Sequence, residues 1–434
     1  MRIAVVGAGW AGLSAAVHAR LAGHQVEIFE AATQPGGRAR ALPLTLPDGR
    51  SIEVDNGQHI LIGAYSATLN LMQHVGVKPQ QALMRLPLAL CYPDGSGLQL
   101  PPWPAPMDAV AGLLTARGWP WSARWALLRR SLYWQAKGFR CRADTSVQQL
   151  CAGLPTIVME SLIEPLCVSA LNTPAERASG QVFLRVLQDS LFGGQGASNL
   201  LLPRTDLGRL LPQAAVAWLR QQGSPVHLGQ RVRALTQADV GWAIDGQTFD
   251  AVVLATSAPN AALALENIAQ RATDSIATAV QGWIRCASAL AHEAIATVYT
   301  YCPGARLPQP MLALHSNAGH PAQFVFDRGQ LGGPDGLWAF VVSASGTERG
   351  LLTQGVLAQA RGQLPHFLGS SPIVALQTVV EKRATFACSP GLARPELCIA
   401  PGLWACGDYV EGPYPATLEG AVRSGVAVVH AIGT

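Results

Sequence analysis

The sequence contains few charged residues for its length. Asp, Glu, Lys and Arg make up 13% of the 434 residues, and 49% are hydrophobic. An average globular protein has about 25% charged residues, so this chain is predicted to fold around a large apolar core rather than to be disordered. The net charge of +4 is small, and a nucleic-acid partner is not expected.

Long hydrophobic runs and paired cysteines are also missing. No apolar run reaches the ~18 residues that a membrane-spanning helix needs. Residues 1–19 superficially resemble a signal peptide, but glycines interrupt them, and a retained strand-turn-helix unit is expected instead. The nine cysteines form no CxxC pair and show no metal-ligand spacing. A reduced cytoplasmic compartment and no metal site are therefore expected.

A nucleotide-binding pattern opens the sequence. A short apolar strand at residues 2–6 is followed by a glycine-rich turn, a helix at 13–22 and a second strand at 25–29 that ends in Glu30. Such glycines allow a tight turn and close approach of a pyrophosphate, and the acid can accept hydrogen bonds from ribose hydroxyls. The turn residues expected to contact the nucleotide are Gly7, Gly9, Trp10, Ala11 and Gly12.

Further phosphate- and sugar-binding elements lie far from this turn. Gly36, Gly37 and Arg38 follow the second strand and offer backbone amides and a guanidinium. Near the C-terminal end, Gly407 and Asp408 close an apolar strand, and Asp408 can hydrogen-bond a ribityl chain. Another helix start follows, with Thr417 and Leu418 as expected contacts. Elements at both ends suit a long flavin dinucleotide, so FAD is the predicted cofactor.

This combination resembles the FAD superfamily of amine oxidases, protoporphyrinogen oxidases and phytoene desaturases. The resemblance implies an α/β fold, with a Rossmann-type FAD domain assembled from residues 1–73, 203–264 and 385–434. Residues 74–202 and 265–384 would form an α+β substrate domain. Residues 230–235 are read as a strand in which the backbone of Val232 meets the adenine, and 250–255 as a buried strand. Residues 193–196 lack the context of a second dinucleotide site and are expected to be a loop.

An unusual stretch lies between residues 103 and 143. Residues 119–134 contain four tryptophans and three arginines, and residues 109–143 hold seven basic side chains and no acid. On a helix, Trp121, Trp125, Leu128 and Leu132 form one apolar stripe flanked by arginines. Two interpretations stay open: a core helix with a solvated basic face, or an interfacial helix that contacts a membrane surface.

The chain also resembles a particular family within that superfamily. Residues 55–59 (DNGQH), 164–174 (EPLCVSALNTP), Ala178-Ser179 and 415–425 (PATLEGAVRSG) look like those of hydroxysqualene dehydroxylases of bacterial hopanoid synthesis. The resemblance implies that reduced flavin delivers hydride to hydroxysqualene, a polyprenoid alcohol, to form squalene. It also implies a cytoplasmic enzyme peripheral to the inner face of the bacterial membrane, and Gly57 near the flavin. The sequence does not identify the electron donor.

A hydroxyl leaving group needs an acid, and four side chains are candidates for the catalytic site. His59 comes first, because histidine can donate a proton near neutral pH, although it can instead be a histidine hydrogen-bonded near the flavin with no role in proton transfer. Glu164, Asn172 and Tyr414 are the others, although Glu164 can instead begin or end a helix and Asn172 can be a turn residue. Asp55 is expected to brace the turn at Asn56-Gly57 rather than to react.

Three other functions compete with this hypothesis. A phytoene-type polyprenoid desaturase has the same fold and a similar substrate, but passes electrons into oxidised FAD. An amine oxidase is less favoured, because that group commonly places an aromatic residue where this chain has Thr417. A flavin-free prenyl-binding carrier is disfavoured by the intact glycine turn, Glu30 and Asp408.

Overall fold

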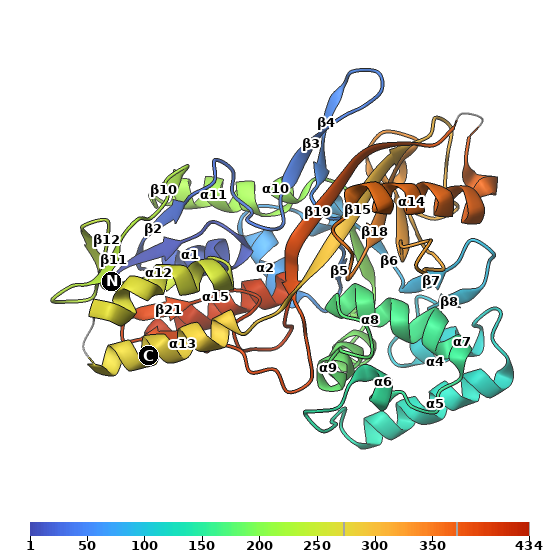
Figure 1. Ribbon diagram of the computed structural model, residues 1–434, viewed down its shortest axis with the longest axis horizontal. Helices are drawn as coiled ribbons and strands as arrows, with labels where there is room; N and C mark the ends of the chain where they lie inside the picture. Colours follow the sequence, from blue (N-terminus) through green and yellow to red (C-terminus); the bar gives the residue numbers. More distant parts are fainter. Residues whose placement is uncertain (272–273, 370–371, 434) are drawn as a thin grey trace.

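The structure, a computed structural model, describes residues 1–271, 274–369 and 372–433. Its first layer is a six-stranded sheet (Figure 1). Five strands are parallel, and the edge strand β20 is antiparallel to β21. In sheet order the strands are β10 (Val226–Leu228), β2 (Gln25–Glu30), β1 (Arg2–Val6), β14 (Ala251–Leu254), β21 (Leu403–Ala405) and β20 (Cys398–Ala400).

Apolar side chains alternate across this sheet, so helices are needed on both faces. In β1, Ile3 and Val5 enter one core and Ala4 enters the other. The first face packs against α1 (Trp10–Leu21), α15 (Leu418–Gly433), α11 (Pro212–Gln221) and α2 (Ser66–His74). The second packs against α12 (Ala258–Arg271), α13 (Asp274–Ser288) and a small sheet of β11 (Leu235–Gln237), β12 (Trp242–Ile244) and β13 (Gln247–Phe249).

A second, antiparallel sheet of five strands forms the other half of the molecule. Its order is β16 (Met311–Ala313), β17 (Phe324–Asp327), β18 (Leu337–Val342), β15 (His292–Tyr301) and β19 (Val374–Phe386). Alternate residues again divide between two cores: Val325 and Phe340 pack toward α14 (Arg349–Gln363), whereas Phe324, Phe326 and Val341 belong to the core shared with the first sheet. Figure 1 shows α14 covering the outer face.

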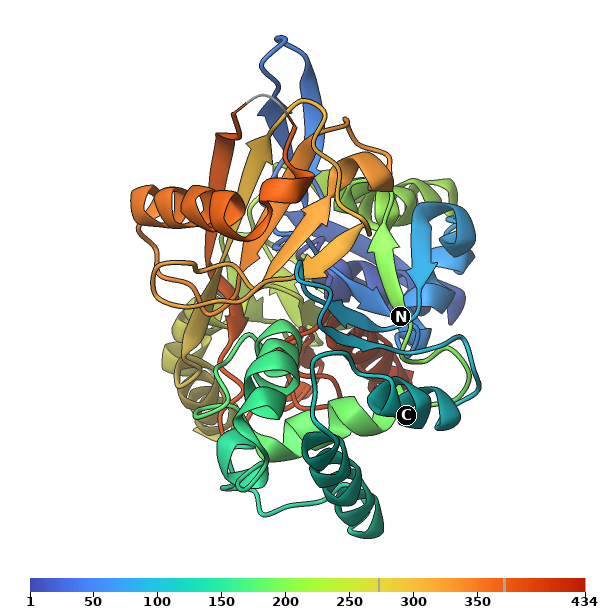
Figure 2. The ribbon, with the colours of Figure 1, turned by 90° about the vertical axis from the view of Figure 1, so that its right-hand side faces the viewer.

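A helical region completes this half and lies at its lower end in Figures 1 and 2. In chain order it comprises α4 (Met107–Leu114), α5 (Trp121–Ala136), α6 (Val147–Leu150), α7 (Thr156–Val158), the π-helix η1 (Met159–Ile163), α8 (Glu164–Leu171) and α9 (Gly180–Leu191). No helix in the described part of the chain is long and apolar enough to cross a membrane.

Short strands and helices connect these layers. The hairpin of β3 (Ala41–Thr45) and β4 (Ser51–Asp55) extends away from the first sheet (Figure 1). Two short strands, β5 (Leu61–Ile62) and β6 (Leu83–Leu86), pair with β9 (Leu200–Pro203), and β7 (Ala89–Cys91) pairs with β8 (Gly97–Gln99). The short helices are α3 (Pro79–Ala82) and α10 (Leu207–Leu210).

The six-stranded sheet draws its strands from residues 2–30, 226–254 and 398–405, which lie within the three segments predicted for the FAD domain. The predicted boundaries at 73/74, 202/203, 264/265 and 384/385 fall inside α2, β9, α12 and β19. Both α12 and α13 pack on the first sheet, so between β14 and β15 the chain passes to the second sheet only after α13. Residues 272–273 and 370–371 of the predicted substrate domain, and residue 434 of the predicted FAD domain, lie outside the described residues.

Candidate functional site

A cavity of about 940 Å³ lies between the two sheets. Its walls include residues at or just beyond the carboxyl ends of four parallel strands. These are Gly7 after β1, Glu30 at the end of β2, Ala255 after β14 and Gly407 two residues after β21. Nucleotides bind open parallel sheets at this carboxyl edge, where the loops leave the strands. The location alone therefore indicates a nucleotide site.

The glycine turn after β1 has the shape that its sequence predicts. Gly7 has a φ of +114°, and a Cβ there would lie 2.7 Å from the carbonyl oxygen of Ala255. A Cβ on Gly12 would lie 2.0 Å from the carbonyl oxygen of Gly7. At Gly9 the nearest atom to such a Cβ is the Cα of Gly37, 3.9 Å away. Two positions thus require glycine for backbone packing, while Gly9 leaves room on the cavity side for a ligand.

Glu30 holds this turn in place. Its two carboxylate oxygens accept hydrogen bonds from the backbone N–H groups of Ala8 and Ala32, each at 2.7 Å. The side chain also lines the cavity, and an ionised carboxylate has further lone pairs that can accept ribose hydroxyls. Glu30 therefore fits its predicted role and fixes the glycine turn at the same time.

Two helices begin at the cavity wall. Trp10 and Ala11 start α1, and Thr417 and Leu418 start α15, and all four residues line the cavity. The Thr417 hydroxyl accepts a hydrogen bond from the N–H of Gly420, which caps α15. The partial positive charge of two helix N-termini favours an anionic ligand at this wall.

Arg38 and Asp408 were both predicted to contact the cofactor, and the structure pairs them with each other. Arg38 forms an ion pair with Asp408 and also donates to the carbonyl oxygen of Ala384 at 2.8 Å. Both side chains line the cavity together with Gly36 and Gly37. Arg38 thus faces the site with its charge partly balanced, and joins the N-terminal and C-terminal segments of the wall.

Val232 lines the cavity, but the strand predicted around it is wrong. Residues 230–234 form no strand, and β11 begins only at Leu235. The chain turns at Gly229, with a φ of +74°, and the N–H of Gln230 donates to the carbonyl oxygen of Glu30. The segment therefore crosses the end of the sheet without a partner strand. The expected loop at 193–196 and the strand within 250–255 agree with the structure.

The remaining polar groups of the cavity fit a bound flavin dinucleotide. Within residues 1–271, 274–369 and 372–433, the buried Tyr409 hydroxyl and Gln58 Nε2 have no hydrogen-bond partner, and both side chains line the cavity. Buried polar groups normally have partners, so these atoms point to a ligand that supplies them. Together with the glycine turn, Glu30 and two helix N-termini, they match the phosphates, sugars and ring of FAD.

His59 lines the cavity beside Gly57, as predicted, but in a different protonation state. Burial lowers its pKa to about 4, and the nearby positive charge of Arg38 acts in the same direction. The ring is therefore neutral at pH 7. The expectation that His59 supplies a proton as an imidazolium near neutral pH is not supported, because desolvation disfavours the charged form.

Of the other catalytic candidates, Asn172 lines the same cavity as His59, and Glu164 and Tyr414 do not. Asn172 lines the cavity at the end of α8, where it has a φ of 46°, donates to the Thr385 hydroxyl at 3.0 Å and accepts the N–H of Ala344 at 2.7 Å. Glu164 and Tyr414 are not among the residues that line the cavity. Glu164 begins α8, and the Tyr414 ring packs against the guanidinium of Arg423.

Asp55 does not brace the Asn56-Gly57 turn. Its carboxylate accepts the N–H of Leu207 at the start of α10, at 2.9 Å, and burial raises its pKa to about 6. Asn56 instead supports the neighbouring loop, because its amide donates to the carbonyl oxygen of Arg38 at 2.6 Å. The predicted brace of the Asn56-Gly57 turn is therefore absent, and Asn56 supports the loop that carries Arg38 instead.

Several apolar and aromatic residues of the cavity lining were not predicted from the sequence. They are Ile60, Tyr65, Ile295, Phe324, Phe326 and Val341. The alternation of Phe324, Val325 and Phe326 predicts a strand with two apolar faces, but no local signal shows which face meets a ligand. Tyr65 has no sequence signal, because it reaches the site from the start of α2 through tertiary packing.

Comparison with known proteins decides the family. The profile of the flavin containing amine oxidoreductases matches residues 10–433. The chain belongs to this family. As a flavin-containing amine oxidoreductase it is an FAD-dependent oxidoreductase, and the residues that line the cavity described above fit this cofactor. The family name covers enzymes with different substrates, so it does not by itself give the reaction.

Full-length relatives of this flavin-containing oxidoreductase include hydroxysqualene dehydroxylases. That of Rhodopseudomonas palustris is 26% identical, over 97% of this chain and 96% of its own length. That of Zymomonas mobilis is 24% identical, over 97% and 96%. An oxidoreductase from Methanosarcina mazei has a similar structure, with a TM-score of 0.71 and 16% identity over 99% of this chain and all of that one. The structural match confirms the predicted α/β fold.

Proposed function

We propose that this protein converts hydroxysqualene to squalene by reductive dehydroxylation. The observation that carries the proposal is the end-to-end similarity to three hydroxysqualene dehydroxylases, each matched over 97% of this chain. The motifs at 55–59, 164–174 and 415–425 support the same reaction. A squalene-forming step would place the enzyme in squalene and hopanoid biosynthesis.

The cavity supports a long apolar substrate. Its lining includes the apolar side chains of Ile60, Ile295, Phe324, Phe326 and Val341. None of these side chains offers a hydrogen bond, so a hydrocarbon chain loses nothing by replacing water there. Asn172 and Ser169 add polar groups near the same space, and an alcohol can use them.

The reaction needs two electrons and one hydrogen on carbon. Reduced FAD, when bound, supplies hydride to the allylic carbon, while the C–O bond breaks and the departing hydroxide takes up a proton to leave as water. The chain must therefore hold the hydroxyl-bearing carbon against the ring, exclude other water and donate hydrogen bonds to the leaving oxygen. The neutral His59 ring, the Asn172 amide and the Tyr65 hydroxyl are suitable donors that line the cavity.

A polyprenoid desaturase is the second candidate. Over 78 residues, 18% of this chain, the sequence is 41% identical to zeta-carotene desaturase of Synechocystis. Such an enzyme would use the same apolar cavity but pass electrons from the hydrocarbon to oxidised FAD. The much longer match to the dehydroxylases favours reduction.

Anaerobic single turnover separates these two reactions. FAD-loaded protein is reduced with dithionite, mixed with hydroxysqualene and followed by flavin absorbance and by mass spectrometry for squalene. Squalene formed in step with flavin reoxidation is expected. Desaturation of a polyprenoid by oxidised enzyme, with no squalene formed by reduced enzyme, would replace the proposal with the second candidate.

A further inference from the structure

Large apolar side chains are exposed on α4, α5 and the loop before them. In the described part of the chain, eight of the fifteen exposed large hydrophobic residues lie between residues 103 and 133. Scattered exposed residues are normal, but such a cluster marks a contact surface. We call these eight residues the α4–α5 surface: Trp103, Met107, Val110, Leu114, Trp121, Trp125, Leu132 and Tyr133.

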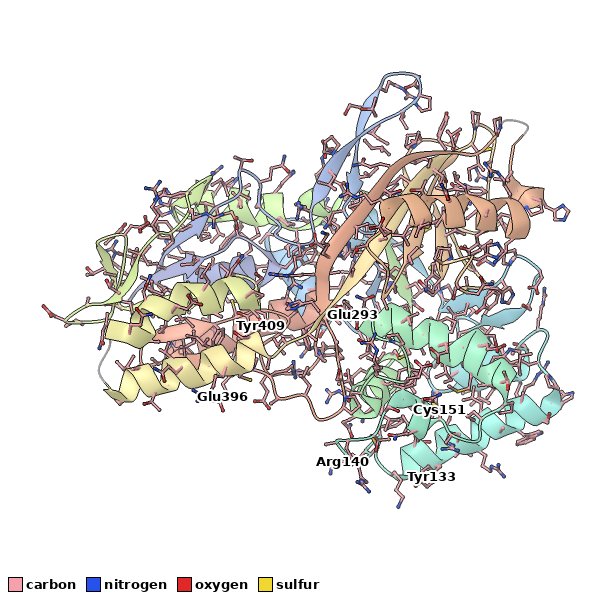
Figure 3. The ribbon with its side chains drawn as sticks, in the orientation of Figure 1. Tyr133, Arg140, Cys151, Glu293, Glu396 and Tyr409 are labelled. Atoms are coloured by element: carbon pink, nitrogen blue, oxygen red, sulfur yellow. The ribbon has the colours of Figure 1, made fainter. Side chains whose placement is uncertain are left out.

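This surface is not needed to hold α5 in place. The helix packs inward through Ala123, Leu127 and Trp134, which are buried. Trp121 and Trp125 lie on the opposite face and are 60% and 61% exposed. Leu132 is exposed as well, whereas Leu128 is partly buried against the core, so three of the four residues of the predicted stripe face away from the core and the core-helix interpretation is wrong for those three. Figure 3 shows Tyr133 at the lower edge of the molecule, with Cys151 inside the helical region.

The charges around this surface are almost all positive. Arg117, Arg129, Lys137 and Arg140 are exposed, and no salt bridge involves them within residues 1–271, 274–369 and 372–433. Asp108, the nearest acid on the N-terminal side, is buried and accepts the N–H of Ala109 at 2.7 Å. The local field is therefore uncompensated and attracts anions.

Arg124 shows how apolar and basic groups are combined here. Its guanidinium lies 4.7 Å from the centre of the Trp121 ring and donates to the carbonyl oxygens of Leu114 and Ala116. These bonds tie the end of α4 to α5, so the two helices present their exposed residues as one unit. A tryptophan beside an arginine suits the boundary between lipid chains and headgroups, where an apolar ring and a charged group are both satisfied.

We propose that the α4–α5 surface docks the protein on an anionic lipid bilayer, with α5 lying in the plane of the interface. The exposed Trp and Leu side chains enter the boundary of the acyl chains, and the flanking Arg and Lys side chains bind lipid phosphates. A bilayer accommodates a broad convex surface, and its negative charge complements the unpaired basic residues. This inference goes beyond the proposed reaction and does not depend on it.

Hydrogen bonds connect the docking surface to the cavity wall. Trp119, between α4 and α5, donates from its indole nitrogen to the Ser161 hydroxyl at 3.0 Å, and Tyr92 donates to the Ser161 carbonyl oxygen at 3.3 Å. Ser161 belongs to the π-helix η1, which runs directly into α8. Ser169 and Ala170 of α8 line the cavity. The bilayer would therefore contact helices that are hydrogen-bonded, through Ser161, to the segment that continues into the cavity wall.

Vesicle flotation of the FAD-loaded protein tests the proposal. One set of vesicles contains equal amounts of phosphatidylglycerol and phosphatidylcholine, and the other contains phosphatidylcholine alone. We expect flotation with the anionic set and much less with the neutral set. Trp121→Ser with Trp125→Ser should reduce binding about tenfold or more, because two exposed rings no longer bury their area in the membrane.

A charge variant and a matched control complete the design. Arg129→Glu with Arg140→Glu should remove the preference for anionic vesicles, since each basic residue near such a surface contributes about 1 kcal/mol, or roughly fivefold. Leu351→Ser with Arg361→Glu changes an exposed leucine and arginine on α14 and should leave flotation unchanged. Flavin absorbance and thermal melting show that each variant is folded.

Two outcomes would overturn the proposal. One is equal flotation of the tryptophan variant and the wild type, which would mean that another surface binds lipid. The other is that the wild type floats with neither kind of vesicle. This outcome includes the case in which the same variants abolish RNA binding or self-association instead.

Discussion

His59 lies in the site where the sequence predicts it, but its protonation state differs from the predicted one. It lies in the cavity, but burial lowers its pKa to about 4, so only about one ring in a thousand is protonated at pH 7. We expect the rate of squalene formation by reduced enzyme to stay constant between pH 6 and 8. A histidine with an ordinary pKa acting as the acid would instead make the rate fall with a midpoint near pH 6.5. His59→Gln, which keeps a hydrogen-bond donor, should slow the reaction by roughly tenfold or less.

The pH profiles of both proteins, measured by rapid quench, check this prediction. A thousandfold loss in the variant, together with disappearance of a wild-type limb near pH 6 to 7, would show that the charged imidazolium is the acid after all.

A second consequence of the low pKa of His59 concerns the stability of the fold. The pKa of His59 is lower in the folded state than in the unfolded state. Its contribution to the free energy of unfolding is therefore fully present above about pH 6.5 and is lost as the pH falls toward 4.

At the scale of elements, the close contact of α1 and α15 shapes the FAD-binding wall. A Cβ on Gly425 would lie 2.5 Å from the carbonyl oxygen of Ala11 and 2.7 Å from the nitrogen of Ala15. Gly425→Ala should therefore push the helices apart, costing about 1–3 kcal/mol, and move both helix N-termini away from the cofactor. Flavin content after purification and the melting temperature measure the effect.

Gly433→Ala is the matched control, because it lies in the same helix and a Cβ there has no neighbour within 4 Å. It should leave flavin content and stability unchanged or slightly improved. If Gly425→Ala bound flavin as the wild type does, the close packing of α1 and α15 would not be what positions the FAD site.

The same scale shows what the sequence can reveal and what it cannot. The unit from β1 to Glu30 was predictable because its strand, glycines, helix and acid are neighbours in the chain, and their spacing carries the signal. A strand was wrongly predicted at residues 230–234, because a strand needs a partner strand and no local sequence pattern shows whether one is present. Phe324 and Phe326 were assigned no role for a similar reason: alternation predicts two faces but not what each face meets.

At the scale of the whole molecule, FAD should act as a structural ligand. Its site combines residues from the beginning, middle and end of the sequence, including Glu30, Val232 and Asp408. Any ligand that binds only the folded state stabilises it, by about 2.7 kcal/mol at a hundred times its Kd. We expect one cooperative thermal transition that moves to higher temperature as FAD is added to flavin-depleted protein.

Differential scanning calorimetry across a range of FAD concentrations measures this shift. Addition of AMP, which can fill only the adenosine part of the site, is a useful control and should give a smaller shift. Two separate transitions, of which FAD moves only one, would show that the halves of the molecule unfold independently despite the apolar core that they share.

The order of strands in the first sheet has a consequence for biosynthesis. β1 lies between β2 and β14, and β14 lies between β1 and β21, so the centre of the sheet is completed only by residues translated late. While the ribosome makes the substrate half, the open edge of β1 and the apolar faces of its neighbours lack their partners, and such edges are prone to aggregate. We therefore expect the nascent chain to require a holding chaperone, and flavin to be incorporated only after translation of α15.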